Sequence, residues 1–354
     1  MPKALLFLSV IAALAGTLPV RPAVAATEPG RSTIGGSGPI KDELDPATRD
    51  AVNKGLAWLA KEVNSGNWMN GGGDSIAISA LAGLAFLADG SLPNDGRYGR
   101  ESQKIMEHVL KNCQESGLVA AQNNSQPMYG HGFATLYLAE VYGMSPRPDV
   151  GEKLHNAVRL IVNTQQPNVG GWRYQALPVD SDISVTICQI MALRAARNAG
   201  IKVPNATIDN AIQYVKKSQE PDGGFRYVIS SGGSGYPRSA AGVAALYYMR
   251  TGNDFTEEIK RGVDYLKARI PGGAGGAGDG EGNFFYANYY ATQAMFMFGG
   301  APWEAYWPGI RKVLLGKQDK ASGNWSGESG TVYATSMSLI MLQVPNRLLP
   351  ILQK

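Results

Sequence analysis

Two segments decide the fold, "QPNVGGWRY" at residues 166–174 and "QEPDGGFRY" at residues 219–227. Both place a glutamine before a Gly-Gly-aromatic turn and end on Arg-Tyr. The Gly-x-aromatic triplet recurs along the chain, at Gly66-Asn67-Trp68, Gly170-Gly171-Trp172, Gly223-Gly224-Phe225, Gly282-Asn283-Phe284 and Gly323-Asn324-Trp325. The long gap after Trp68 leaves room for one degenerate unit, around "QPMYGHGFATLYLAEVYGM" at residues 126–144. The pattern therefore predicts six repeats of one structural unit.

Each unit predicts two helices, one before the triplet and one after it. The leading helices carry a single apolar stripe at helical spacing: Val52, Leu56, Leu59 and Val63; Leu154, Val158 and Ile161; Ile208, Ile212 and Val215; Ile259, Val263 and Leu266. The trailing helices are apolar or small almost all round, and are expected within residues 74–90, 131–144, 182–200, 238–253, 286–300 and 331–344. No segment shows the alternation typical of a strand.

Six such hairpins predict an all-α protein, an (α/α)6 toroid or barrel. Helices that are apolar all round suit an inner ring, and helices with a charged face suit an outer ring. The Gly-x-aromatic loops join outer helices to the N-termini of inner ones, so we expect all six loops on one rim. Functional residues are expected on that rim.

The repeat also resembles a known superfamily. The segments starting at Gln166 and Gln219 match the Q-x-x-x-G-x-W/F repeat of squalene cyclases and prenyltransferases; Glu62 to Trp68 matches with Glu for Gln, and Gln318 to Trp325 with one residue inserted. The chain looks like a single-barrel, exported "prenyltransferase and squalene oxidase repeat" protein over residues 47–345. The resemblance implies the α/α toroid and points to a terpenoid or other lipid ligand. It does not by itself imply an activity.

The N-terminus is expected to be removed or flexible. Residues 1–25 combine Lys3, an apolar run and alanines at A-x-A spacing, which predicts a signal peptide. Residues 26–46 predict a flexible leader and residues 47–354 the toroid domain. Without residues 1–25, which hold Lys3 and Arg21 and no acid, the formal net charge falls from +4 to +2. We expect a secreted or periplasmic protein with no nucleic-acid partner and no membrane span after cleavage; a protein partner stays unspecified.

Asp180 and Asp182, in "DSDI" before the third inner helix, are the candidate acid pair. In the class II terpene cyclases that the chain resembles, the middle aspartate of D-x-D-D protonates an alkene. Asp182 matches that aspartate, but Ile183 replaces the last one, which weakens the expected proton-donor network. The alternative is that Asp182 is the N-cap of the helix, with Asp180 solvated or favoured by the helix dipole. The two roles are compatible.

His131 is a further candidate acid or base, since it lies at the predicted start of an inner helix. The alternative is a structural histidine. The protein prenyltransferases bind zinc through Asp, Cys and His, but Cys188 follows Asp182 by six residues and no histidine follows it. We therefore predict no metal and no cofactor. Cys113 and Cys188, the two cysteines, are expected to be separate buried thiols.

The rim is rich in arginine and tyrosine. The predicted ligand-binding residues are Arg173, Tyr174, Arg226, Tyr227, Arg238, Tyr286, Tyr289 and Tyr333, beside Tyr129, Tyr236 and Tyr290. Such side chains stack on sugars or bind an anionic head group, or they serve only in rim packing, with Arg173 and Arg226 paired to carboxylates. Three functions stay open: a toroid that binds an apolar or isoprenoid-type small molecule or lipid, a carbohydrate-active polyuronide lyase or hydrolase, and a non-catalytic envelope binding or scaffold protein.

Overall fold

The computed structural model describes residues 44–69, 75–122, 124–251, 254–270, 283–327 and 329–353. The predicted signal peptide, most of the predicted leader and the glycine-rich residues 271–282 lie outside these. The described residues form twelve α-helices: α1 Pro46–Ser65, α2 Ser75–Ala88, α3 Gly99–Lys111, α4 Pro127–Met144, α5 Pro148–Asn163, α6 Ile183–Asn198, α7 Asn205–Lys217, α8 Tyr236–Met249, α9 Thr256–Lys267, α10 Phe284–Phe298, α11 Gly300–Lys317 and α12 Thr331–Gln343. None of these helices is long and apolar enough to cross a membrane.

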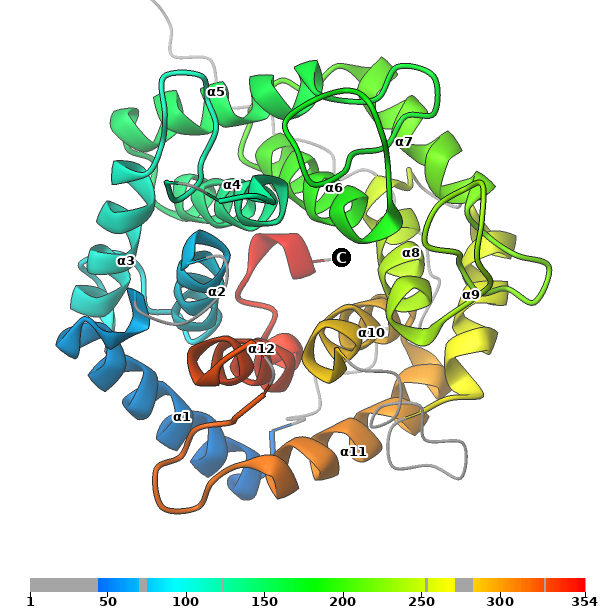
Figure 1. The fold of residues 1–354 in the computed structure, drawn as a ribbon. Coiled ribbons are helices and arrows are strands. Elements are labelled where there is room, and N and C mark those ends of the chain that lie inside the picture. Colours follow the sequence, from blue (N-terminus) through cyan, green and yellow to red (C-terminus); the bar gives the residue numbers. More distant parts are fainter. Residues whose placement is uncertain are drawn as a thin grey trace, which may run out of the picture. The chain divides into compact units, whose positions relative to one another are not determined.

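The helices form two concentric rings (Figure 1). The even-numbered helices α2 to α12 are the inner ring, in which each helix contacts the next and α12 contacts α2. The odd-numbered helices surround them. No strand occurs in the described part of the chain, where the backbone pairs across segments only at isolated bridges. The predicted all-α fold, an (α/α)6 toroid, is confirmed.

The two rings differ as their side-chain patterns require. In α6 nearly every residue is buried, including Ser184, Thr186 and Gln189, because both faces of an inner helix meet other helices. In α9 only one stripe is buried, and charged residues cover the other face. Two outer helices were not predicted from apolar stripes: α3, whose stripe is short, and α11, which contains Pro308.

A glutamine ties each regular loop to the next outer helix. Gln219 Nε2 donates to Gly223 O (3.1 Å) within its loop and to Glu258 O (2.8 Å) in α9. Gln318 Nε2 does the same with Gly323 O and Ala51 O, both at 2.8 Å, so it joins the last repeat to α1. The bonds to Glu258 O and to Ala51 O connect segments far apart in the sequence. The ring is thus closed by the same contact that links consecutive repeats.

In the third repeat the structure corrects the assignment of this glutamine. Gln165, not Gln166, donates to Gly170 O (2.7 Å) and to Thr207 O (2.9 Å) of α7. The Gln166 side chain instead accepts from the amides of its own turn, at Asn168 and Val169. Gln165 and Gln318 each precede the loop glycine by five residues. The inserted residue inferred for the last repeat is therefore one of two spacings that the loop accepts.

No other residue type fits at these loop glycines. Gly170, Gly223 and Gly323 have φ of +91°, +88° and +85°, and a Cβ on Gly223 would lie 2.3 Å from Arg261 O of α9. Gly117 shows the same features, with φ +91° and Asn156 O of α5 at 2.4 Å from a Cβ. The loop of the degenerate second unit is therefore Gly117-Leu118-Val119, earlier in the chain than expected, with valine in the aromatic position.

In the third and sixth repeats a tryptophan fastens the loop to both helices of its own repeat. Trp172 Nε1 donates to Ile161 O of α5 (2.8 Å) and Trp172 N to Thr186 Oγ1 of α6 (3.0 Å). Trp325 repeats this with Leu314 O (2.7 Å) and Thr335 Oγ1 (3.0 Å). Both indoles are fully buried. These bonds satisfy backbone groups that the burial would otherwise leave without partners.

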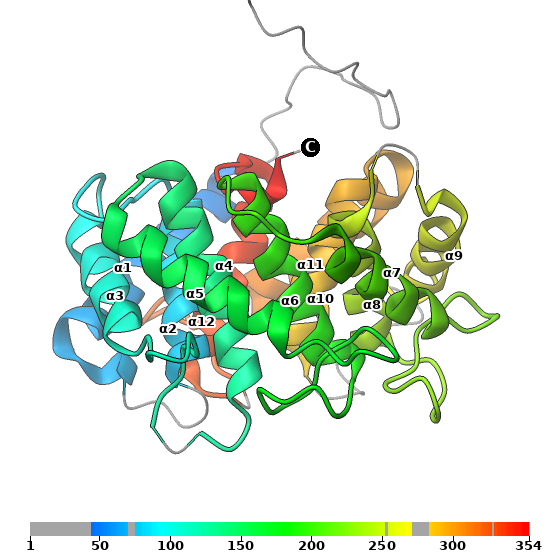
Figure 2. The ribbon, with the colours of Figure 1, turned by 90° about the horizontal axis from the view of Figure 1, so that it is seen from above.

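The C-terminal segment, which holds the short 3-10 helices η2 Val344–Asn346 and η3 Pro350–Leu352, folds into the ring. It closes the end opposite the repeat loops (Figure 2), and η3 packs against α4 and α6. Leu349, Ile351 and Leu352 are buried, and Ile351 N donates to Glu140 Oε2 of α4 (3.2 Å). Burial raises the pKa of Glu140 to about 8. The apolar pattern of the repeats does not predict this closure.

The loop glycines provide a test of the architecture. We expect Gly223→Ala to destabilise the protein more than Gly200→Ala. Both positions have positive φ, which costs alanine about 1–2 kcal/mol, but a Cβ at Gly200 meets no atom within 4 Å while one at Gly223 would overlap Arg261 O. Urea unfolding of both variants measures the difference. Equal losses would mean that the loop does not depend on close contact with α9.

Candidate functional site

The candidate site lies on the loop rim where α6 begins. Asp182 is the N-cap of α6, with extended backbone. Its amide donates to Trp172 O (3.0 Å), and Ile183 N donates to Tyr227 O (3.0 Å) in the loop of the next repeat. Two neighbouring repeat loops therefore hold the start of this helix. The predicted cap is confirmed, and it is built from the same segments that define the fold.

The carboxyl group of Asp182 is fully buried. Its Oδ1 accepts from Val185 N (2.9 Å), which is the capping bond, and from Ser184 Oγ (2.6 Å). Its Oδ2 has no hydrogen-bond partner within the described residues, and Arg173 Nε lies 3.6 Å away. Burial raises the pKa of Asp182, against the opposing effects of Ser184, Val185 and Arg173. Asp182 therefore holds its proton to higher pH than an ordinary aspartic acid.

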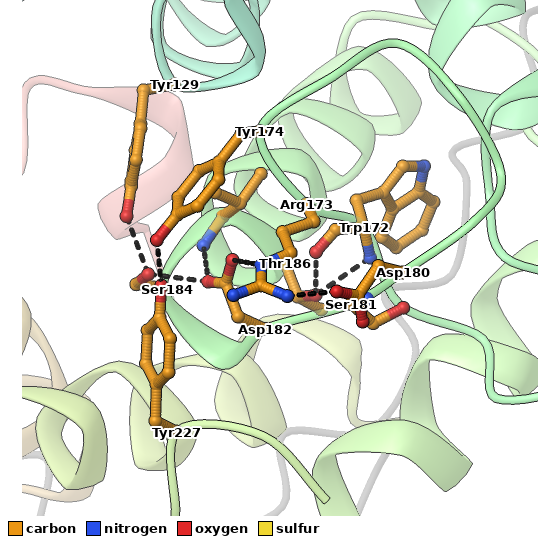
Figure 3. Close-up of polar contacts among 11 residues, drawn as sticks. Tyr129, Trp172, Arg173, Tyr174, Asp180, Ser181, Asp182, Ser184, Thr186 and Tyr227 are labelled. Carbon is orange, nitrogen blue, oxygen red and sulfur yellow. Dashed lines mark hydrogen bonds and ion pairs between the residues drawn. The ribbon is translucent and has the colours of Figure 1, made fainter. Parts of the chain in front are cut away.

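Arg173 joins the two predicted acids (Figure 3). Its guanidinium pairs through NH1 with Asp180 and lies over the Tyr174 ring, 5.1 Å from the centroid. The Asp180 side chain is half exposed. The two carboxyl groups thus differ: Asp180 is solvated and paired with Arg173, whereas Asp182 is enclosed.

Tyrosines from four segments converge on Ser184, next to Asp182, and three of them, Tyr129, Tyr174 and Tyr227, are drawn in Figure 3. Tyr129 of α4 shares a hydrogen bond with Ser184 Oγ (2.6 Å), and Tyr286 of α10 donates to Ser184 O (3.2 Å). The Tyr174 and Tyr227 hydroxyls pair with each other. Burial raises the pKa of Tyr129, Tyr227 and Tyr286. We call this group the Asp182 cluster: Tyr129, Arg173, Tyr174, Asp180, Asp182, Ser184, Tyr227 and Tyr286.

The remaining predicted rim residues lie outside the cluster. Arg226 pairs with Glu220 and donates to Ile229 O (2.8 Å), and Arg238 Nε donates to Gly233 O (3.0 Å). Both therefore hold the loop of the fourth repeat. Tyr289 is buried against Phe133 and Tyr290, and Tyr333 packs edge-on against Phe285. The predicted pairing of Arg173 and Arg226 with carboxylates is present.

His131 has a structural environment. Its Nδ1 accepts from Val119 N (3.1 Å), and its Nε2 lies 3.2 Å from Ala157 O of α5. In the third and sixth repeats the same loop amide donates to a threonine hydroxyl, at Thr186 and Thr335. Burial lowers the pKa of His131 to about 4. His131 thus substitutes for the hydroxyl of the regular repeat and does not contact the Asp182 cluster.

The two cysteines are not paired with each other. Cys188 of α6 is buried, and its Sγ lies 3.4 Å from both Ser184 O and Tyr290 OH. Burial raises the thiol pKa to about 12 for Cys188 and to about 11 for Cys113. Both therefore stay protonated at neutral pH. Among the described residues no three His, Cys, Asp or Glu side chains gather to hold a metal ion.

Comparison with solved structures supports the architecture. The type II terpene cyclase MstE from Scytonema, in complex with geranylgeranyl dihydroxybenzoate, matches with a TM-score of 0.58 and 14% identity, over 86% of this chain and 98% of that one. The GH76A α-1,6-mannanase from Salegentibacter sp. HEL1_6 matches with a TM-score of 0.65 and 8% identity, over 85% and 99%. The chain shares the α/α toroid fold of these enzymes.

These identities establish the fold alone. No family model and no curated protein matches the chain. A GH76 α-mannanase from Bacteroides thetaiotaomicron also matches, with a TM-score of 0.59 and 12% identity over 85% of this chain and 95% of that one. The toroid expected from the squalene-cyclase resemblance is thus confirmed at the level of fold, and two enzyme classes share it.

Ser184 is the functional residue that sequence reasoning missed. It connects Asp182 with Tyr129 and Tyr286, but a serine in the first turn of a helix carries no distinctive pattern. Tyr129 was noted only as one of many rim tyrosines. Both depend on contacts between α4, α6 and α10, which lie far apart in the sequence. Only Asp182, an acid directly before a predicted inner helix, could be recognised from its neighbours in the sequence.

Two variants test the environment of Asp182. We expect Asp182→Asn to keep most of the stability, because the amide oxygen still accepts from Val185 N and Ser184 Oγ. Asp182→Ala leaves both donors without a partner and is expected to cost about 1–2 kcal/mol more. Thermal melts and urea titrations compare the two. An alanine variant as stable as the asparagine variant would contradict the capping role.

The burial of His131 predicts how the stability of the protein depends on pH. In the folded protein its pKa is about 4, below its ordinary value of 6.5, so its contribution to stability is complete above pH 6.5 and is lost as pH falls toward 4. Between these pH values the wild type should lose about 3 kcal/mol of its free energy of unfolding through this histidine, and His131→Thr should remove that loss. Urea unfolding from pH 7.5 to 4 measures it.

His155→Thr, at an exposed position on α5, is the matched control and should keep the wild-type slope. The His131 variant is expected to be less stable at pH 7.5, since threonine fills less volume. Its free energy of unfolding should nevertheless change less with pH. A wild-type slope in His131→Thr would show that the histidine is not held neutral by burial.

Proposed function

We propose that this toroid binds an amphipathic, isoprenoid-type ligand at its loop rim, and that Asp182 is the proton donor for any reaction there. The observation that carries the proposal is the Asp182 carboxyl group. It is fully buried, its pKa is raised, and its Oδ2 has no hydrogen-bond partner within the described residues. A buried carboxyl group with a raised pKa, whose second oxygen accepts no hydrogen bond within the described residues and lies 3.6 Å from Arg173 Nε, is suited to general acid chemistry.

The aromatic surroundings support a ligand that develops positive charge. Tyr129, Tyr174 and Tyr227 converge beside Asp182 (Figure 3), and Tyr286 reaches Ser184 from α10. The faces of aromatic rings attract cations, and desolvation strengthens the attraction. Protonation of an alkene by Asp182 would produce such a cation. The same rings would bind an isoprenoid chain through apolar contact.

The carboxyl groups favour proton donation over glycoside hydrolysis. Most glycosidases use two carboxyl groups that flank the scissile bond, about 5–9.5 Å apart. Here Asp180 and Asp182 approach the same guanidinium, that of Arg173, so they are not placed on opposite sides of a substrate. Arg173 also neutralises Asp180. One enclosed acid remains, which is sufficient for protonating an alkene.

The polar parts of the cluster suit the head group of an amphipathic ligand. Arg173 and the tyrosine hydroxyls offer charge and hydrogen bonds at the rim, and the inner helices behind them are largely apolar. The similar MstE structure contains geranylgeranyl dihydroxybenzoate, a ligand of this kind. That likeness supports the proposal through a shared fold. The substitution of Ile183 for the last acid of D-x-D-D argues for slower chemistry or for binding alone.

Carbohydrate processing is the second candidate. The described rim presents Arg, Asp and Tyr side chains rather than Phe, Met and Leu, which is the composition expected of a glycan-binding groove. The similar mannanases have the same fold. A non-catalytic envelope protein that uses this rim for binding is the third candidate. For all three we infer an exported protein from the signal-peptide pattern of residues 1–25.

Isotope incorporation tests the first candidate. We would incubate the protein with geranylgeranyl dihydroxybenzoate in D2O and analyse the products by mass spectrometry. Protonation followed by ring closure and proton loss gives an isomer that carries one deuterium. Asp182→Asn should still bind the probe but form product about 10²–10⁴-fold more slowly, because an amide cannot donate this proton. Tyr142→Phe, near the C-terminal end of α4 and therefore away from the loop rim, is the control and should behave like wild type.

Lipid extraction of the purified protein, followed by mass spectrometry, gives an independent readout of the ligand class. An isoprenoid in the extract, or saturable binding of the probe, supports the proposal. Binding or cleavage of α-1,6-mannotriose with no isoprenoid binding would overturn it in favour of the carbohydrate candidate. Absence of both would leave the scaffold candidate.

A further inference from the structure

A cavity lies toward the C-terminal end of α6, opposite to Asp182. It has a volume of about 250 Å³ and is lined by the last turns of α6 and α8 and the first turn of α7: Ile190, Arg194, Arg197, Asn198, Ile208, Tyr248, Met249 and Thr251. The α6 residues that line this cavity, from Ile190 to Asn198, lie about 12–24 Å along the helix from Asp182, at 1.5 Å per residue. It therefore does not belong to the Asp182 cluster.

The cavity has an excess of positive charge. Arg194 and Arg197 lie three residues apart on one face of α6, and Arg250 follows α8, with its guanidinium over the Tyr247 ring. Burial, then the charge of Arg197, lowers the pKa of Arg194, and Arg250 contributes in the same direction. No Asp or Glu is among the lining residues. Arg194 and Arg197 thus give the cavity lining two positive charges, and Arg250 adds a third beside it.

The two lining arginines also lack the contacts of structural arginines. In the described part of the chain neither guanidinium has a recorded ion pair or hydrogen bond. This contrasts with Arg173 and Arg226, which pair with carboxylates. The helix dipoles favour positive charge at the C-terminal ends of α6 and α8, which accounts for one arginine near each end. Both lining arginine side chains are exposed, so a ligand in the cavity can reach their guanidinium groups.

We propose that this cavity binds a phosphate monoester. Guanidinium groups are planar donors that match phosphate oxygens, and a doubly charged anion suits a site with several positive charges better than a single carboxylate. Asn198 and Thr251 add polar groups, and Ile190, Ile208 and Met249 form an apolar wall for the organic part of the ester. The volume is below the roughly 300–1,000 Å³ of pockets for drug-sized ligands, so it fits a small head group.

Calorimetric titration of the protein with glycerol 3-phosphate tests the proposal. We expect saturable binding of one equivalent, with no binding of glycerol. Arg194→Gln should weaken the affinity about tenfold or more, as loss of a charge-assisted hydrogen bond does, and Arg194→Gln combined with Arg197→Gln should abolish it. Arg159→Gln, at an exposed position on α5, removes the same charge elsewhere and should leave the affinity unchanged.

Thr251→Glu provides a variant that keeps both arginines. Thr251 is exposed, so the substitution should fold normally while placing a negative charge at the cavity, and we expect at least a tenfold loss of affinity. Flotation with phosphatidylcholine vesicles, with and without phosphatidic acid, shows whether a lipid head group can supply the phosphate. No saturable binding of glycerol 3-phosphate and no phosphatidic acid dependence, or equal weakening by Arg159→Gln, would overturn the proposal. Because Asp182 is untouched, the result is independent of the proposed rim function.

Discussion

The contact of four loop glycines, Gly117, Gly170, Gly223 and Gly323, with the next outer helix is the constraint on which the barrel depends. Gly170, Gly223 and Gly117 each adopt a left-handed backbone conformation and lie so close to the neighbouring helix that a side chain cannot fit. The loop glutamine then donates across the same junction. At Gln318 this donation reaches α1, so the contact that spaces consecutive repeats also closes the ring. One local geometry, used repeatedly, produces a toroid rather than an open solenoid.

The candidate site is a consequence of this junction. Asp182 is held by Trp172 of its own loop and is followed by Ile183, which is held by Tyr227 of the next loop. An N-cap at that point is forced to be buried, because two repeats meet over it. The capping bond uses one carboxyl oxygen and leaves the other enclosed beside Arg173. In the proposed function, one carboxyl group would serve both helix capping and acid chemistry, and it is the fold that buries this group and raises its pKa.

The two ends of the barrel differ in character. The loop end presents the Asp182 cluster, and the opposite end is closed by the C-terminal segment, whose Ile351 amide meets the buried Glu140. At that end of α6, Arg194 and Arg197 have no acidic partner among the residues that line their cavity. Since each inner helix runs from one end to the other, α6 carries a candidate site at each of its termini. A ligand at one end need not interfere with the other.

The sequence by itself determined the helical class, the number of repeats and the loop rim, because apolar periodicity and Gly-x-aromatic spacing are local properties. It also identified Asp182 as a helix cap. It misplaced the second loop, where Val119 replaces the aromatic residue. It also matched Gln166 to the repeat motif, whereas the bonds to the loop and to the next outer helix are made by Gln165.

Only the tertiary structure decided which residues surround Asp182. Ser184, Tyr129 and Tyr286 come from three inner helices whose contacts depend on the closed ring. The structure likewise showed His131 to replace a threonine hydroxyl and the C-terminal segment to close one end of the barrel. Burial decides these roles: the pKa of an acid or a histidine depends on what covers it, and the covering residues are distant in sequence.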